Sequence, residues 1–119
     1  MPTTAEHRAK AENNEFLSSE LNNPFWDWAV TGIFYAALHY VEAYFSSRIP
    51  PLRPPTHKLR AGYIHADAYL DPIYIDYRQL EDESRNARYD ARMTFDQADV
   101  VRTRAYLEKI KAVVIPLLP

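Results

Sequence analysis

The segment from Pro24 to Phe45 constrains the fold of this chain more than any other part of the sequence. It is apolar and aromatic along almost its whole length, yet polar residues recur at every third or fourth position. These residues are Asp27, Thr31, Tyr35, His39 and Glu42. Because residues three and four apart share one face of a helix, they predict a polar stripe on an apolar rod. Such a helix belongs at the centre of a bundle, and an unpaired buried polar group costs about 1–3 kcal/mol, so the stripe must face polar partners.

The composition predicts one folded domain, residues 1–119. Hydrophobic residues make up 47% of the chain, which is enough for a core in a domain of ordinary size. The absence of cysteine excludes disulfides, thiol catalysis and cysteine-bound metals. A formal net charge of −2 gives no general reason to expect duplex DNA binding, so any nucleic-acid contact needs a local basic patch.

The beginning of the chain and its apolar segment predict a cytoplasmic location. The opening residues, MPTTAEHRAKAENNE, lack the apolar stretch of a signal peptide. Asp27, His39 and Glu42 interrupt the only run that approaches the length of a membrane span, about 18 apolar residues. We therefore expect no contact with a membrane.

Sparse glycine and the spacing of the apolar residues predict an all-α fold. Only two glycines occur, and no segment alternates in the manner of a strand. Thr3 with Glu6, and Thr94 with Gln97, have the spacing of a capping box. The predicted helices span residues 4–22, 24–47, 56–67, 72–90 and 95–117. The connection RIPPLRPP before the short third helix should be irregular and exposed. The expected architecture is an up-and-down helical bundle of four long helices plus one short helix.

The apolar spacing also predicts which side chains face the core. For the first helix these are Ala9, Asn13, Phe16, Leu17 and Leu21. For the second they are Phe34, Leu38 and Val41, and for the fourth Ile73, Tyr77, Leu80, Ser84 and Ala87. For the fifth they are Ala98, Val101, Ala105, Ile110, Val113 and Leu117.

Two further segments carry side chains that suit phosphate chemistry. His57 and Arg60 lie at the start of the third helix, where the helix dipole favours a neutral imidazole that can act as a base. Towards the end of the fourth helix, arginines recur at three- and four-residue spacing beside an asparagine and a tyrosine, which suit phosphate and base contacts. The residues of this basic ridge are Arg85, Arg88, Arg92, Asn86 and Tyr89.

Each of these patterns also has a purely structural interpretation. The stripe on the second helix can consist of hydrogen bonds between helices in a core. The charges of the ridge can pair along an outer face, for example Arg85 with Glu81. Arg88 can also be an internal clamp, because a buried arginine needs a carboxylate and Glu42 supplies one.

No cofactor or metal motif is present in the sequence. The four histidines lack HExxH spacing, no glycine-rich phosphate loop occurs, and no serine lies in a nucleophile elbow. We therefore predict no metal and no cofactor.

The order of the motifs resembles the HEPN family of small helical domains, over nearly the whole chain. The opening pattern A-x-x-x-N-x-x-F-L matches Ala9 to Leu17. The aromatic residue, alanines, histidine and glutamate of Tyr35–Glu42 match the central helix, with His39 where many members carry glutamine. His57 opens the next short helix, Arg88-Tyr89 closes the fourth, and an amphipathic helix from Phe95 to Leu117 completes the pattern.

This resemblance implies a dimeric helical bundle. Many HEPN proteins are metal-independent endoribonucleases that act as toxins or in defence, and others are partners of minimal nucleotidyltransferases. Active members carry an arginine, a polar residue after it, and a histidine about four to six residues later. Arg85-Asn86 is similar to the start of this motif, whereas residues 90–92 contain no histidine. If the protein cleaves RNA, His57 or His39 would have to supply the imidazole from another helix.

Two functional hypotheses follow. The first is a homodimeric HEPN-like protein that binds RNA or a nucleotide. If it cleaves RNA, its catalytic residues would be Arg85, which stabilises charge on phosphorus, and His57 or His39, which takes the 2′-hydroxyl proton. Its ligand-binding residues would be Asn86, Arg88, Tyr89, Arg92, Arg60 and Glu42. The second hypothesis is a non-catalytic helical module that partners a nucleotidyltransferase or a toxin.

Overall fold

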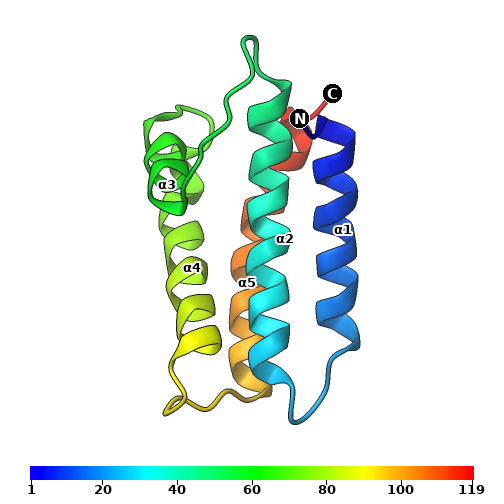
Figure 1. Cartoon of the computed structure of the whole chain (residues 1–119), viewed down its shortest axis with the longest axis vertical. Helices are drawn as coiled ribbons and strands as arrows, with labels where there is room; N and C mark the ends of the chain where they lie inside the picture. Colours follow the sequence, from blue (N-terminus) through cyan, green and yellow to red (C-terminus); the bar gives the residue numbers. More distant parts are fainter.

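The computed structural model describes every residue from Met1 to Pro119 and contains helices and connecting segments only (Figure 1). The helices are α1 (Thr4–Glu20), α2 (Trp26–Ser47), α3 (His57–Ala66), α4 (Tyr74–Tyr89) and α5 (Gln97–Val114). Two short 3₁₀ helices complete the chain: η1 (Asp71–Ile73) precedes α4, and η2 (Ile115–Leu117) follows α5. The predicted all-α bundle is confirmed. None of the helices combines the length and the apolar character that crossing a membrane would require.

α2 lies at the centre of the bundle, as its apolar sequence predicts. It packs against α1, α4 and α5, whereas α1 and α4 lie on opposite sides of it (Figure 1). Phe34, Leu38 and Val41 are buried, which confirms the prediction for this helix. α3 is seated beside the beginning of α4, and both chain ends lie at the same end of the bundle (Figure 1).

The helix boundaries follow local capping chemistry. Thr3 and Glu6 form the predicted capping box, with the Glu6 amide donating to Thr3 Oγ1 over 3.1 Å. The predicted box of Thr94 and Gln97 is wrong. Asp96 caps α5 instead, because Asp99 stands three residues later and accepts from the Asp96 amide over 2.9 Å. α4 begins at Tyr74, since Pro72 opens a separate 3₁₀ turn.

The predicted inner face of α1 is wrong except for Leu21, which is half-buried against the core just after the helix. Phe16 and Leu17 are 68% and 53% exposed, Ala9 and Asn13 are also exposed, and the buried residues are Ala11 and Ser18. The cause is a close approach of the two backbones: a Cβ on Gly32 of α2 would lie only 3.4 Å from Ser18 Cβ. At that separation only small side chains fit between the helices.

The predicted face of α5 is shifted by two residues over the first half of the helix, whereas Val113 and Leu117 pack half-buried against the core as predicted. Val100, Thr103, Leu107, Ile110 and Val114 are buried, whereas Ala98, Val101 and Ala105 are exposed. Only Ile110 among the buried residues was predicted. Thr103 can be buried because its hydroxyl donates to the Asp99 carbonyl over 2.8 Å. The face of α4 is predicted correctly for Ile73, Tyr77, Leu80 and Ser84, and Ala87 is half-buried. The proline-rich connection is irregular, but Pro54 within it is buried.

Candidate functional site

A cleft of about 520 Å³ lies between the first turns of α3 and the outer face of α4. α3 contributes His57 and Lys58 from its first turn, and α4 contributes side chains three and four residues apart, which share one face of the helix. These are Arg78, Glu81 and Arg85. The α3 side of the cleft is open at Gly62, where a Cβ would meet nothing within 4 Å. The cleft therefore presents several cationic side chains around one carboxylate.

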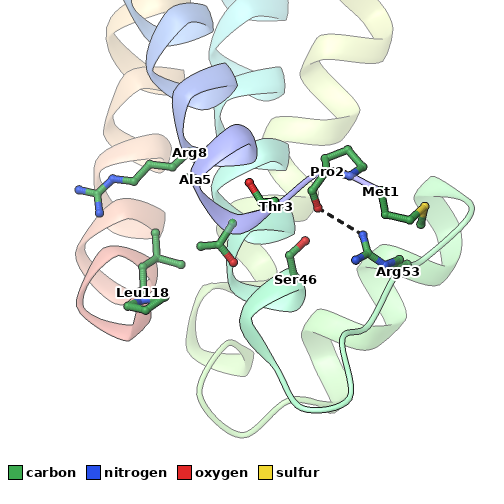
Figure 2. A pocket seen from close by; sticks show the side chains of 10 residues that line it. Met1, Pro2, Thr3, Ala5, Arg8, Ser46, Arg53 and Leu118 are labelled. Atoms are coloured by element: carbon green, nitrogen blue, oxygen red, sulfur yellow. Dashed lines mark hydrogen bonds between the residues drawn. The ribbon is translucent and has the colours of Figure 1, made fainter.

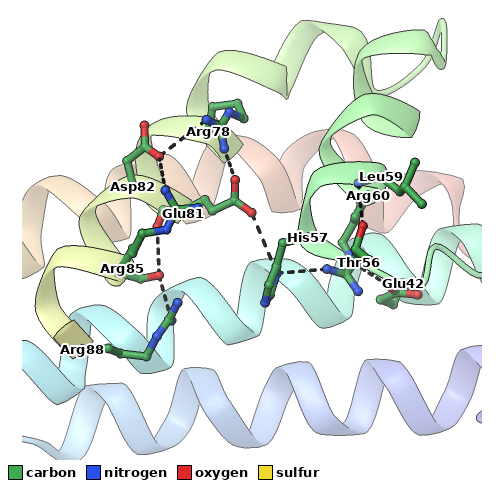
Figure 3. A network of polar contacts seen from close by, with 11 residues as sticks. Glu42, Thr56, His57, Leu59, Arg60, Arg78, Glu81, Asp82, Arg85 and Arg88 are labelled. Atoms are coloured by element: carbon green, nitrogen blue, oxygen red, sulfur yellow. Dashed lines mark hydrogen bonds and ion pairs between the residues drawn. The ribbon is translucent and has the colours of Figure 1, made fainter.

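A network of polar contacts runs from α2 through α3 to α4 beside this cleft (Figure 3). Glu42 of α2 accepts from Arg60 Nε over 2.5 Å, and both side chains are about nine-tenths buried. The same guanidinium donates from Nη1 to His57 Nδ1 over 3.2 Å. His57 Nδ1 also lies 3.8 Å from Glu81 Oε2, and Arg78 pairs with Glu81 Oε1. The charges of three helices are thus coupled through Arg60 and His57.

His57 is held as a neutral imidazole with a defined tautomer. Burial, followed by the nearby Arg60 charge, lowers its pKa, and Glu81 opposes the shift. Since Arg60 donates to Nδ1, that nitrogen carries the lone pair and the ring proton is on Nε2. Half of the side chain remains exposed at the mouth of the cleft. In this state Nε2 is a hydrogen-bond donor to a ligand rather than a base.

The arginines predicted to form one ridge are in three different environments. Arg85 lines the cleft and lies 3.7 Å from Asp82, and its ion pair is with this residue rather than with Glu81. Arg92 lies beyond the end of α4 and pairs with Asp90 over 3.2 Å. Asn86 is half-buried on α4, and neither it nor Arg92 lines the cleft.

Arg88 is packed among aromatic rings. Its guanidinium carbon lies 5.6, 5.3 and 5.3 Å from the ring centres of Phe34, Tyr35 and Tyr89, and Nη1 donates to Ser84 Oγ over 3.0 Å. The predicted clamp between Arg88 and Glu42 is wrong, because Arg60 occupies Glu42. Tyr89 is largely exposed beyond Arg88 and does not line the cleft. Arg88 therefore holds α4 against α2 through cation–π contacts.

His39 lies outside the cleft. Its Nδ1 is 3.1 Å from Nδ1 of His7 on α1, and the two rings are stacked with their centres 5.4 Å apart. Burial, and then the His7 charge, lower the pKa of His39 to about 4, and burial also lowers the pKa of His7. The structure thus brings His57 and Arg85 together at the cleft but places His39 between α1 and α2.

Sequence reasoning missed part of the cleft. Lys58, Arg78 and Glu81 line it but were not among the predicted site residues. Arg78 and Glu81 share a helix face with Arg85, so their spacing was an available signal. Nothing local pointed to His7, because its partner lies 32 residues away in the sequence.

A second hollow, also of about 520 Å³, lies where the two chain ends meet (Figure 2). Arg8 and Arg53 border it, together with Ser46 and Leu118 (Figure 2). Arg8 pairs with Glu12 over 3.2 Å, and Arg53 donates to the Pro2 carbonyl over 3.3 Å. With both arginines engaged and no histidine, aspartate or glutamate side chain in its lining, this hollow is a weaker site than the cleft.

No group of three or more histidine, aspartate or glutamate side chains is placed to hold a metal ion. No protein-family model matches the chain, and neither the curated proteins nor the solved structures contain a match. The cleft must therefore be interpreted from its own chemistry.

Proposed function

We propose that the cleft between α3 and α4 binds the phosphate of RNA or of a nucleotide. The observation that carries the proposal is the convergence of Lys58, Arg78 and Arg85 on one cleft at the N-terminal turn of α3. Free backbone amides and the dipole at a helix N-terminus favour an anion. Arginine adds a planar fork that suits phosphate oxygens.

The placement of His57 beside Arg85 favours RNA cleavage as a second activity of the same cleft. In that reaction, which requires the His57 tautomer with a free lone pair on Nε2, the 2′-oxygen would attack phosphorus while its proton moves to this nitrogen, and the bond to the 5′-oxygen would break. The 5′-oxygen leaves as a hydroxyl after taking a proton from solvent, and the other product is a 2′,3′-cyclic phosphate. Arg85 would stabilise the charge that develops on the phosphorus oxygens.

The resemblance of the sequence to HEPN domains supports this proposal and adds a homodimer to it. A face for such a contact is available, which we call the open face. It is a groove of about 360 Å³ on α1 and α2 with an almost entirely apolar lining that includes Leu17, Leu21, Trp28 and Tyr35. Large exposed apolar patches are typical of interaction surfaces.

The open face equally favours the alternative function, a non-catalytic module that partners a nucleotidyltransferase or a toxin. In that case the groove would receive a different protein, and the cleft would have no ligand. A nucleotidyltransferase gene beside the gene for this chain would favour the alternative.

Binding of a single-stranded RNA oligonucleotide by Arg85→Ala tests the proposal. Arg85 is half-exposed and pairs only with Asp82, so the variant should fold normally. We expect weaker binding and a salt dependence reduced by about one phosphate contact. The matched control is Arg92→Ala, which removes an equally charged side chain outside the cleft and should leave binding unchanged. Equal RNA affinity in folded Arg85→Ala and in the wild type would favour the interaction module instead.

A further inference from the structure

The carboxylate of Glu81 is only half satisfied. Its side chain is 4% exposed, and Arg78 pairs with Oε1, whereas Oε2 is buried without a hydrogen-bond partner. Buried carboxylate oxygens nearly always accept a hydrogen bond. A donor that reaches Oε2 in a second state of the site would complete the arrangement.

His57 is the side chain placed to become that donor. Its Nδ1 lies 3.8 Å from Oε2, too far for a hydrogen bond but within reach of a small rotation of a half-exposed ring (Figure 3). Arg78 is engaged with Oε1, and Arg85, one turn further along α4 at the same cleft, lies 3.7 Å from Asp82. Catalytic hydrogen bonds are often long in a free site and shorten when the ligand binds.

Arg60 and Glu81 make opposite demands on the His57 ring. The Arg60 Nη1 donor at 3.2 Å requires a lone pair on Nδ1, whereas Glu81 Oε2 requires a proton there. The two contacts therefore exclude one another. Arg60 does not depend on His57 for its own position, because its Nε is held by Glu42 at 2.5 Å.

We propose that Glu81 is a positioning residue for His57 and that Arg60 selects between two tautomers of the ring. With Arg60 on Nδ1, the proton is on Nε2 and the ring cannot accept a proton from a ligand. When Arg60 Nη1 turns to another acceptor, Nδ1–H donates to Glu81 and the Nε2 lone pair becomes free to act as a base. This inference rests on the proposed function, since a phosphate in the cleft is the acceptor that draws Nη1 away.

Long-range proton–nitrogen correlation spectra of the full chain with nitrogen-15 histidine test the inference. At about pH 8 the ring is neutral, so the spectra report which nitrogen of His57 carries the proton. The signals are assigned by their loss in His57→Gln. We expect Nε2–H in the free wild type and Nδ1–H after saturation with inorganic phosphate.

Three variants probe the contact between His57 and Glu81 without and with phosphate. Arg60→Lys keeps a charge for Glu42 but loses the forked guanidinium, so it should show mostly Nδ1–H with no phosphate added. Adding Glu81→Gln to it should lower the Nδ1–H to Nε2–H ratio about tenfold, the effect of one charge-assisted hydrogen bond. Glu81→Gln alone should bind phosphate yet keep Nε2–H.

The outcomes separate this inference from the proposed function. Phosphate that binds to the wild type and not to Arg85→Ala, with His57 remaining Nε2–H throughout, would overturn the tautomer exchange and leave phosphate binding standing. Absence of phosphate binding in the wild type would refute the proposed function, and Arg60→Lys alone would then decide the inference. Folded Arg60→Lys with mostly Nε2–H would refute the positioning role of Glu81.

Discussion

The cleft between α3 and α4 and the open face on α1 and α2 both depart from the rule that apolar side chains are buried and charged ones exposed. Beside the cleft, charged side chains are buried, whereas on the open face apolar side chains are exposed. In the cleft network, the charged side chains of Glu42, Arg60 and Glu81 are about nine-tenths buried or more. On the open face, Leu17 and Trp28 are 53% and 58% exposed. The polarity of a residue alone therefore does not decide whether it is buried in this bundle. The distance between the two helices and the presence of a partner for each charged side chain also decide it.

The two regions reach this result by different physical means. α1 lies so close to α2, at Gly32 and Ser18, that bulky side chains are excluded from the contact and remain outside. α3 touches the rest of the bundle mainly through α4 and η1, and its long Arg60 side chain reaches Glu42 on α2. Charged groups can be buried there because each finds a partner.

The largest expected loss of stability distinguishes a leucine in the core from a leucine on the open face. Leu38 on α2 is 7% exposed within the core, so Leu38→Ala should lower the unfolding free energy by about 2–5 kcal/mol. Leu17 is half-exposed on the open face, so Leu17→Ala should cost about 0.5 kcal/mol or less in the monomer. Chemical denaturation of both variants measures the difference. A loss below about 0.5 kcal/mol in Leu38→Ala would mean that α2 is not central.

A smaller effect should distinguish two arginines on α4. Arg88→Ala removes a guanidinium packed over three rings and should cost about 1–2 kcal/mol with a lower Tm, whether or not RNA is present. Arg85→Ala should leave Tm nearly unchanged, because Arg85 is half-exposed and its ion pair is weak. Thermal unfolding with and without RNA measures both. Equal Tm values for the two variants would contradict a structural role for Arg88.

The fold could be predicted from the sequence because its signals are local. The apolar run of α2, the capping box of Thr3 and Glu6, and the proline-rich connection all act within a few residues. The inner faces of α1 and α5 could not be predicted as well. Phe16 and Leu17 outweigh Ala11 and Ser18 in any count of apolar residues, and only the approach at Gly32 reverses that choice.

The candidate site was predictable only in part, for a related reason. The placement of His57 and Arg85 follows from helix starts and helix faces, which the sequence specifies. The partners of Glu42 and His39 do not, because Arg60 and His7 lie 18 and 32 residues away. Which of several arginines pairs with Glu42 depends on where α3 sits against the bundle, and that is a property of the tertiary structure.

The His7–His39 pair predicts a loss of stability in acid. The pKa of His39 falls to about 4 and that of His7 is also lowered, mainly through burial, whereas both rings titrate near pH 6.5 when unfolded. Between these values the unfolded chain binds more protons, so the unfolding free energy must decrease as pH falls from about 6.5 towards 4. Since His39 is only half-buried, we expect an effect on the order of 1 kcal/mol.

Denaturation of the wild type and of His39→Gln across this pH range measures the effect. Glutamine keeps a hydrogen-bonding side chain beside His7 but cannot take up a proton. The difference between the two proteins removes the contribution of carboxylates that titrate in the same range. Parallel stability curves for the two proteins would show that the pair does not resist protonation.

The smallest expected effect on folding, and the sharpest test of the open face, is Trp28→Ser. Trp28 is 58% exposed and lines the groove, so its loss should change the unfolding free energy of the monomer by about 0.5 kcal/mol or less. Light scattering of the wild type should give the mass of a dimer at micromolar concentration, and Trp28→Ser should give that of a monomer, because exposed aromatic anchors dominate contact energies.

Ile75→Ser is the matched control, since Ile75 is 66% exposed at the start of α4, at the other end of the bundle (Figure 1). A monomeric wild type would contradict the homodimer and leave the open face to a different protein. Dissociation by Ile75→Ser as well would mean that general surface apolarity, and not this face, drives association.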